Sequence, residues 1–166
     1  MLSEIRDLNT VGFAVTEMLT RLIYHSENHL GPFDGKMMDD LNSIMEVAVR
    51  KNEAANITGA LIFDNIWFMQ VLEGEREALS ATLRRIMADE RHDNVTIMDV
   101  RPIHERMFAN WWMGIAAVQG ASEKLLTRHG VGPRFNPSKM TGEQALLLTV
   151  DLAQQGLSRK LASAAV

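Results

Sequence analysis

The chain has 166 residues, of which 46% are hydrophobic and 23% charged, with a formal net charge of −4 at pH 7 and no cysteine. This length suffices for one domain with its own core, and the lack of cysteine excludes disulfides, thiol nucleophiles and cysteine-bound metals. The negative charge disfavours nucleic acid as a partner. No apolar run reaches the roughly 18 residues of a membrane span, and the first residues do not resemble a signal peptide. We therefore expect a cytoplasmic protein that contacts no membrane.

The first half of the chain predicts a strand, a helix and a hairpin. A lead segment, 1–18, has a weak helical pattern, and residues 19–26 then predict a strand. Residues 37–52 keep apolar side chains at helical spacing. Two apolar runs flank Asp64-Asn65, and these residue types tolerate the backbone of a tight turn. The pair therefore predicts a β-hairpin.

The following segment predicts a second helix and two more strands. Residues 75–89 form an amphipathic helical pattern, 94–101 predict a fourth strand and 111–117 a short fifth strand. The resulting order, βαββαββ, is typical of an α+β, ferredoxin-like sandwich in which two helices cover one face of a mixed sheet.

The pattern changes after Val118 to a loop followed by helices. Thr141 and Gln144 have the spacing of a capping box ahead of a helix at 145–155, and Gly156 predicts the end of that helix. A last short helix is expected at 157–164. We divide the chain into an N-terminal extension (1–18), a domain (19–118) and a C-terminal helical segment (119–166).

The second hairpin strand is apolar on both faces. One face carries Phe68, Gln70 and Leu72, and the other carries Trp67, Met69 and Val71. Both faces should therefore be covered. The two long helices can cover only one of them, so the C-terminal helices or a second subunit must cover the other.

Three polar residues stand out in this apolar setting. Gln70 lies in mid-strand and needs partners for its amide, which a bond to backbone at a strand edge would also supply. Tyr24, the single tyrosine, points to a covered face, as an ordinary core tyrosine does. Asn52 ends the first long helix and, taken alone, is best interpreted as a C-cap amide.

Metal and catalytic motifs are incomplete. The run that starts at His104 resembles a zinc-protease helix, but phenylalanine stands where the second histidine belongs. His25 and His29 are followed at once by glycine and proline, which disfavours a helical metal pair. We expect no metal site, and we find no nucleophile–base set that would make the protein an enzyme.

Taken together, five segments resemble the BLUF family of blue-light sensors that use FAD. They are RLIYHS (21–26), RKNEAANITGALIF (50–63), FMQVLEG (68–74), IMADERHDNV (86–95) and ERMFANWWMG (105–114). Several motifs in one order make a specific resemblance, and the fold of the family agrees with the predicted βαββαββ order.

The resemblance implies a photochemical site. Tyr24 would donate an electron and a proton to the excited flavin, Gln70 would stand between Tyr24 and the ring, and Asn52 would bind the C4 carbonyl edge. The resemblance assigns further flavin contacts to Lys51, Arg91 and His92, apolar ring neighbours to Ile57, Ile62 and Phe68, and a signalling pair of the fifth strand to Trp111 and Met113. Trp112, where a small polar residue is commoner, leaves open which way Trp111 points.

The function implied is that of a photoreceptor. Light would drive transfer from Tyr24, Gln70 would rearrange, and a new hydrogen bond would shift flavin absorption to the red. FAD is the expected cofactor, with FMN and riboflavin as alternatives. Output would pass through protein–protein contacts, in a homo-oligomer (a dimer or larger) and to an unidentified downstream protein. The alternative is a non-photoactive ferredoxin-like module that binds a ligand or acts as a dimeric regulator.

Overall fold

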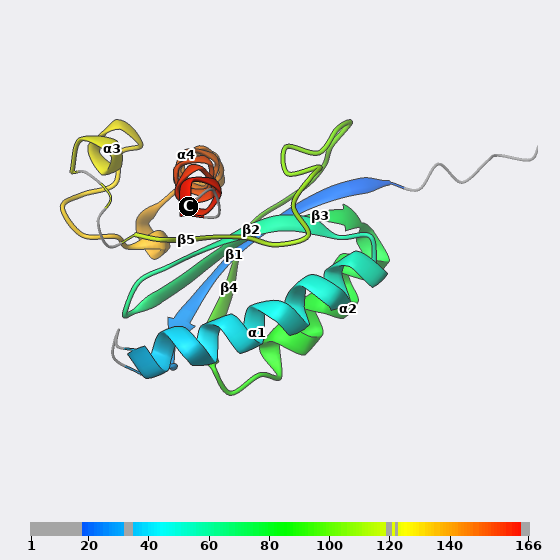
Figure 1. The fold of residues 1–166 in the computed structure, drawn as a ribbon. Helices are drawn as coiled ribbons and strands as arrows, with labels where there is room; N and C mark the ends of the chain where they lie inside the picture. The colour runs from blue at the N-terminus through cyan, green and yellow to red at the C-terminus, as the bar shows by residue number, and fades with distance from the viewer. Residues whose placement is uncertain (1–17, 32–34, 119–120, 122, 164–166) are drawn as a thin grey trace, which may run out of the picture.

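The computed structural model describes the chain except residues 1–17, 32–34, 119–120, 122 and 164–166. The helical pattern expected within 1–18 therefore lies almost wholly outside the described residues. The described chain forms one sheet with helices on both faces (Figure 1).

The sheet has five strands in the order β4-β1-β3-β2-β5. Pairing is antiparallel between β1 and β3, β1 and β4, and β2 and β3, whereas β2 and β5 are parallel. The sheet is therefore mixed, and the predicted α+β, ferredoxin-like fold is confirmed. The strands are β1 (Leu19–Asn28), β2 (Thr58–Phe63), β3 (Trp67–Glu75), β4 (His92–Pro102) and β5 (Gly114–Ala117).

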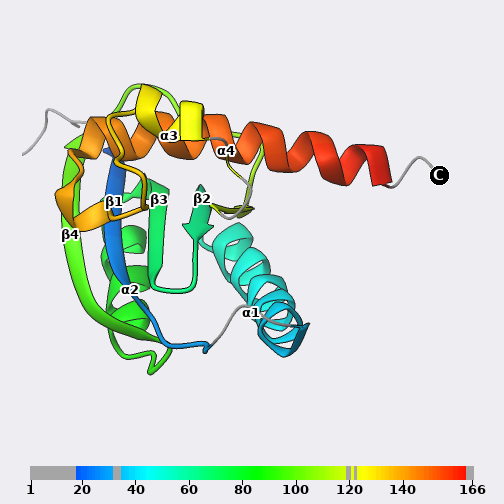
Figure 2. The same cartoon turned by 90° about the vertical axis from the view of Figure 1, so that its left-hand side faces the viewer.

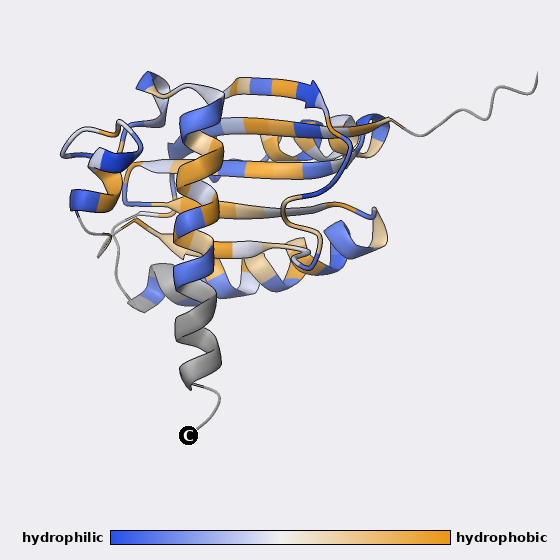
Figure 3. Ribbon diagram, turned by 90° about the horizontal axis from the view of Figure 1, so that it is seen from above, coloured by the Kyte–Doolittle hydropathy of each residue, from blue (hydrophilic) through white to orange (hydrophobic). Residues whose placement is uncertain are grey.

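The helices form two layers around the sheet. Helices α1 (Gly35–Ala54) and α2 (Arg76–Met87) lie on one face, while α3 (Glu123–Arg128) and α4 (Gly142–Ser163) lie on the other (Figure 1). A short 3-10 turn, η1 (Pro137–Lys139), precedes α4. Seen from above, α4 crosses the strands (Figure 3), and its C-terminal turns run past the sheet (Figure 2).

Successive side chains of β3 point to opposite faces of the sheet and so divide the core in two. Met69 and Val71 belong to the cluster beneath α4, whereas Leu72 and Phe68 belong to clusters on the side of α1 and α2. The expectation that both faces are covered is thus confirmed, with α4 covering the second face of the same chain. From here on, the two sides are called the α1/α2 face and the α4 face.

The capping box ahead of α4 is confirmed, but the helix begins at Gly142, three residues earlier than predicted, and its predicted end is wrong. The backbone N–H of Thr141 donates to Gln144 Oε1 at 2.9 Å, and the N–H of Gln144 donates to Thr141 Oγ1 at 3.2 Å, as in a capping box. The predicted stop at Gly156 is wrong, because α4 continues to Ser163. A glycine inside a helix costs only about 1 kcal/mol relative to alanine, which by itself does not end the helix.

The fifth strand begins later than expected, at Gly114 instead of Trp111. Its pairing with β2 starts at the Ala60–Gly114 pair. Before that point the chain makes single bonds to other elements, such as that from Gly59 N to Trp111 O at 2.9 Å. Trp111 and Met113 therefore precede the strand and do not alternate within it.

Candidate functional site

A cavity of about 470 Å³ lies on the α1/α2 face. Strand residues Tyr24, Leu61 and Gln70 form its floor, and Met113 joins them from the segment before β5. The size is within the range of small-molecule and cofactor pockets. The helices, the segment after α2 and the first residue of β4 contribute the other lining residues, which are Ser43, Ile44, Met45, Val47, Ala48, Lys51, Asn52, Thr82, Arg85, Ile86, Asp89, Arg91 and His92.

Tyr24, Gln70 and Met113 form a hydrogen-bonded series along the floor. Tyr24 and Gln70 are register partners on β1 and β3, and the tyrosine hydroxyl donates to Gln70 Oε1 at 2.5 Å. Gln70 Nε2 in turn donates to Met113 Sδ at 3.1 Å. The amide of Gln70 is thus satisfied by two side chains and not by the backbone.

Burial keeps the Tyr24 hydroxyl protonated. Tyr24 is completely buried, and desolvation raises its pKa, with a further contribution from the negative charge of Asp89. The hydroxyl is therefore a neutral donor at physiological pH, and Gln70 is its acceptor.

Asn52 lies near the C-terminal end of α1, with 4% of its surface exposed. Its Nδ2 donates to Trp112 O at 2.9 Å, across to the segment before β5. The C-cap interpretation is wrong, because the helix runs to Ala54 and this side chain bonds to another part of the chain. Lys51, which also lines the cavity, remains exposed to solvent.

The rim beside α2 combines an ion pair with a neutral histidine. Asp89 accepts from the Arg91 guanidinium, and this bond lowers the pKa of Asp89. Ser26 Oγ lies 2.7 Å from His92 Nδ1, and the Phe68 ring is 4.7 Å from the His92 ring. Desolvation lowers the pKa of His92 to about 4, so the imidazole is uncharged at neutral pH.

These side chains fit a flavin by their chemistry. The walls are largely apolar, as a planar ring requires, and the amides of Asn52 and Gln70 can meet polar atoms at a ring edge. Lys51, Arg85 and Arg91 are cations suited to a phosphate-bearing tail. Among the described lining residues, Asp89 is the one carboxylate, and it is bonded to Arg91, so none of them presents an unpaired negative charge to the cavity.

The structure corrects the placement of one residue expected near the ring and shows which way Trp111, left open by the sequence, is turned. Ile62 pairs with Met69 in the hairpin and belongs to the cluster beneath α4, so its expected position is wrong and Leu61 lines the cavity instead. Trp111 packs against that same cluster, while Met113 faces the cavity. The supposed pair is thus divided between the two faces.

Most of the other residues named from the sequence line the cavity, and two lie beside it on the same face. The cavity brings together Tyr24, Lys51, Asn52, Gln70, Arg91, His92 and Met113. Ile57 and Phe68 are on the α1/α2 face but outside the lining. Sequence reasoning missed Thr82, Arg85 and Ile86 of α2, which the 3.6-residue period of that helix could have placed on its inner side.

Among the described residues, one group of possible metal ligands gathers outside this cavity. Glu27, His29 and Asp93 bring ligand atoms within 4.8 Å of one another. His29 and Asp93 are exposed at the surface, where charged groups commonly gather without a metal.

A ferredoxin-like sheet with a cofactor-sized cavity under two helices defines a small-molecule-binding domain. The sequence model of BLUF, sensors of blue-light using FAD, matches residues 19–114. The chain therefore belongs to the BLUF family.

Relatives include photoactivated adenylate cyclase subunit beta of Euglena gracilis, 37% identical over 87 residues, which are 52% of this chain and 10% of that protein. The blue light- and temperature-regulated antirepressor BluF of Escherichia coli (strain K12) is 36% identical over 78 residues, which are 47% of this chain and 18% of that protein. The chain thus spans a small part of the length of these curated relatives.

Two solved structures resemble the chain over most of its length. BlsA in its photo-activated state has a TM-score of 0.71 and 26% identity, covering 82% of this chain and 95% of that chain. BlrB, a BLUF protein in its dark state, has a TM-score of 0.64 and 26% identity, covering 83% and 98%. Within the described residues, we find no helix with the length and apolar character to cross a bilayer.

Proposed function

We propose that this protein is a blue-light receptor that binds FAD in the cavity between the sheet, α1 and α2. The observation that carries the proposal is the hydrogen-bonded series of Tyr24, Gln70 and Met113 along the cavity floor. FMN and riboflavin share the ring that this floor would meet, so they are the alternative bound forms.

The residues proposed to hold the flavin fall into two groups. Asn52 and Gln70 offer amides to the carbonyl edge of the ring, and His92 is a neutral neighbour. Lys51, Arg85 and Arg91 are placed at the cavity as cations for a phosphate tail. Ile57 and Phe68 are apolar neighbours beside the cavity on the α1/α2 face.

The proposed photochemistry uses two side chains. A bound flavin supplies absorption of blue light and an excited state that takes up an electron. Tyr24 gives up the electron together with its hydroxyl proton, and both return to Tyr24 when the cycle closes. Gln70 rotates or tautomerises, which exchanges donor and acceptor without changing its charge, and the resulting hydrogen bond to the ring moves absorption to the red.

We propose that output leaves the domain through protein–protein contacts, within a homo-oligomer and to a downstream protein. Support comes from the position of β2 and β3, which carry cavity residues on one side and contact α4 on the other. Trp111, two residues before Met113, packs against the cluster beneath α4. A change at the cavity floor is thus close to the second layer of helices.

The test is the absorption spectrum of the Tyr24→Phe variant. This variant should bind flavin as the wild-type protein does but show no reversible red shift under blue light, because phenylalanine has neither the proton nor the low oxidation potential of tyrosine. A normal shift in Tyr24→Phe would remove Tyr24 from the mechanism. A wild-type protein that folds but takes up no flavin would contradict the proposed function and favour a non-photoactive ligand-binding or regulatory module.

A further inference from the structure

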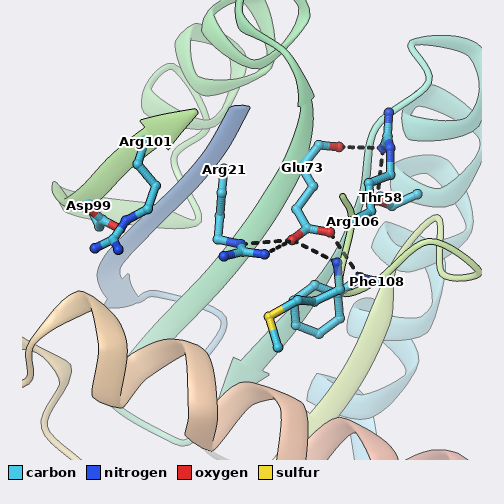
Figure 4. A network of polar contacts seen from close by, with 8 residues as sticks. Arg21, Thr58, Glu73, Asp99, Arg101, Arg106 and Phe108 are labelled. Carbon is cyan, nitrogen blue, oxygen red and sulfur yellow. Dashed lines mark hydrogen bonds and ion pairs between the residues drawn. The ribbon is translucent and has the colours of Figure 1, made fainter. Parts of the chain in front are cut away.

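A fully buried carboxylate ties the segment before β5 to the strand that carries Gln70. Glu73 lies on β3 with 0% of its surface exposed. Its Oε1 accepts from Arg21 Nε at 2.8 Å, and Arg21 Nη2 lies 2.7 Å from the same atom. The backbone N–H groups of Met107 and Phe108 donate to Oε1 and Oε2 at 3.2 and 3.0 Å. Figure 4 shows these groups converging on the carboxylate.

Charge and geometry make this contact specific. A buried carboxylate is tolerated when it is paired and hydrogen-bonded, and Arg21 supplies the opposite charge. Two successive backbone N–H groups divided between the two oxygens then fix both position and orientation of residues 107–108. An amide in place of the carboxylate would have only one acceptor oxygen for these donors.

Arg106 holds the same segment through three further hydrogen bonds. Its Nη1 donates to Glu73 O at 2.7 Å and to Thr58 Oγ1 at 2.9 Å, and its Nη2 donates to Asn56 O at 2.7 Å. The guanidinium thereby joins the segment to the ends of two neighbouring strands (Figure 4). Residues 106–108 are held from both sides, and we call them the anchor.

The other end of the segment reaches the cavity. Trp112 O accepts from Asn52, and Met113 Sδ accepts from Gln70. Between the anchor and these contacts lie only residues 109–111. Within that stretch the Trp111 ring is 5.5 Å from the Phe108 ring, and Trp111 packs against the cluster that α4 covers.

We propose that Glu73 is a positioning residue for signal transmission, which holds the anchor fixed so that a movement of Met113 is converted into a movement of Trp111 against α4. The inference rests on the proposed function, because it needs a rearrangement of Gln70 to begin. With residues 106–108 fixed, a displacement of Met113 must be taken up by the few residues between the anchor and Met113. With the anchor loosened, the whole segment shifts and α4 receives less of the displacement.

The test compares two readouts in the full-length, flavin-loaded protein. The first is the red shift under blue light, which reports the cavity, and the second is the light-to-dark ratio of amide hydrogen exchange in α4. Coupled sites typically change an equilibrium by roughly 5- to 150-fold. In Glu73→Gln we expect an unchanged red shift and an exchange ratio in α4 that falls toward one. The matched control is Glu105→Gln, the same substitution at an exposed position of the same segment, which should retain both signals.

Arg106→Gln keeps the buried ion pair and provides a second test if Glu73→Gln does not fold. It removes the three outer bonds and should also lower the exchange ratio without changing the red shift. A wild-type ratio in the folded variants would overturn the proposal, as would a wild-type protein that shifts its spectrum without any light-dependent exchange in α4. Loss of the red shift in Glu73→Gln alone would also overturn it, since Glu73 would then act on the cavity. A wild-type protein without a red shift would instead contradict the proposed function.

Discussion

The two faces of the sheet are packed differently, although the same strands form both. On the α1/α2 face the helices leave a cavity of about 470 Å³ with amides and cations around it. On the α4 face, aliphatic and aromatic side chains from the sheet, α3 and α4 form one continuous cluster. A cavity accepts a ligand, whereas a close-packed layer has low compressibility and passes on strain. The difference supports the two proposals made above, that the α1/α2 face binds the ligand and that the α4 face receives a displacement.

The first prediction tests the packing of the α4 face with the variant Leu148→Ala. Leu148 is 0% exposed in the cluster beneath α4, and removing such a side chain leaves a void. We expect a loss of about 2–5 kcal/mol in the free energy of unfolding, measured by urea denaturation. Leu147→Ala is the matched control, because Leu147 is 45% exposed and should change stability by no more than about 0.5 kcal/mol. Equal losses in the two variants would show that α4 is not packed as a filled layer.

The second prediction concerns the pH dependence of stability that arises on the α1/α2 face. Burial lowers the pKa of His92 from 6.5 to about 4, so between these values the unfolded chain binds a proton that the folded chain excludes. Stability therefore falls as the pH drops from about 6.5 toward 4, and this contribution is absent at neutral pH. The single group accounts for about 2–3 kcal/mol of destabilisation between pH 7 and about pH 4.5.

Urea denaturation of flavin-free protein at the two pH values measures this effect. His92→Gln cannot take up the proton and should show a smaller loss of stability on acidification than the wild-type chain. His25, whose pKa burial also lowers, contributes in the same direction in both proteins and cancels in the comparison. The same pH dependence with and without His92 would contradict the assignment.

Local pattern was enough to predict the order of the strands and to single out Tyr24 and Gln70 as polar residues in apolar strands, whereas their role in a site came from the family resemblance. Tyr24 and Gln70 were recognisable because polar atoms within apolar strands need a partner, and their register pairing supplies one. The face of Ile62 could have been taken from its pairing with Met69 across the hairpin, since residues paired across two strands share a face. The family resemblance alone placed it on the wrong side.

What sequence could not predict depends on contacts between distant residues. The late start of β5 is consistent with the bonds of residues 106–108 to Glu73, which lies more than thirty residues earlier in the chain. No local signal in the ERMFANWWMG segment indicates that partner. The divided positions of Trp111 and Met113 were likewise not predictable from a strand pattern, because both residues precede β5.

The smallest effect comes from adding volume to each face in turn. Ala145 of α4 is 0% exposed in the filled cluster, and Ala145→Leu should cost about 1–3 kcal/mol, because overpacking forces neighbours out of position. Ala48 lines the cavity from α1, so Ala48→Leu has room and should change the unfolding free energy of flavin-free protein by no more than about 0.5 kcal/mol. Flavin affinity should show the reverse order, with Ala48→Leu weakening binding and Ala145→Leu leaving it unchanged in the folded fraction. Denaturation and flavin titration of both variants measure the two effects, and a cost to stability of the same size on both faces would mean that the cavity cannot accept added volume.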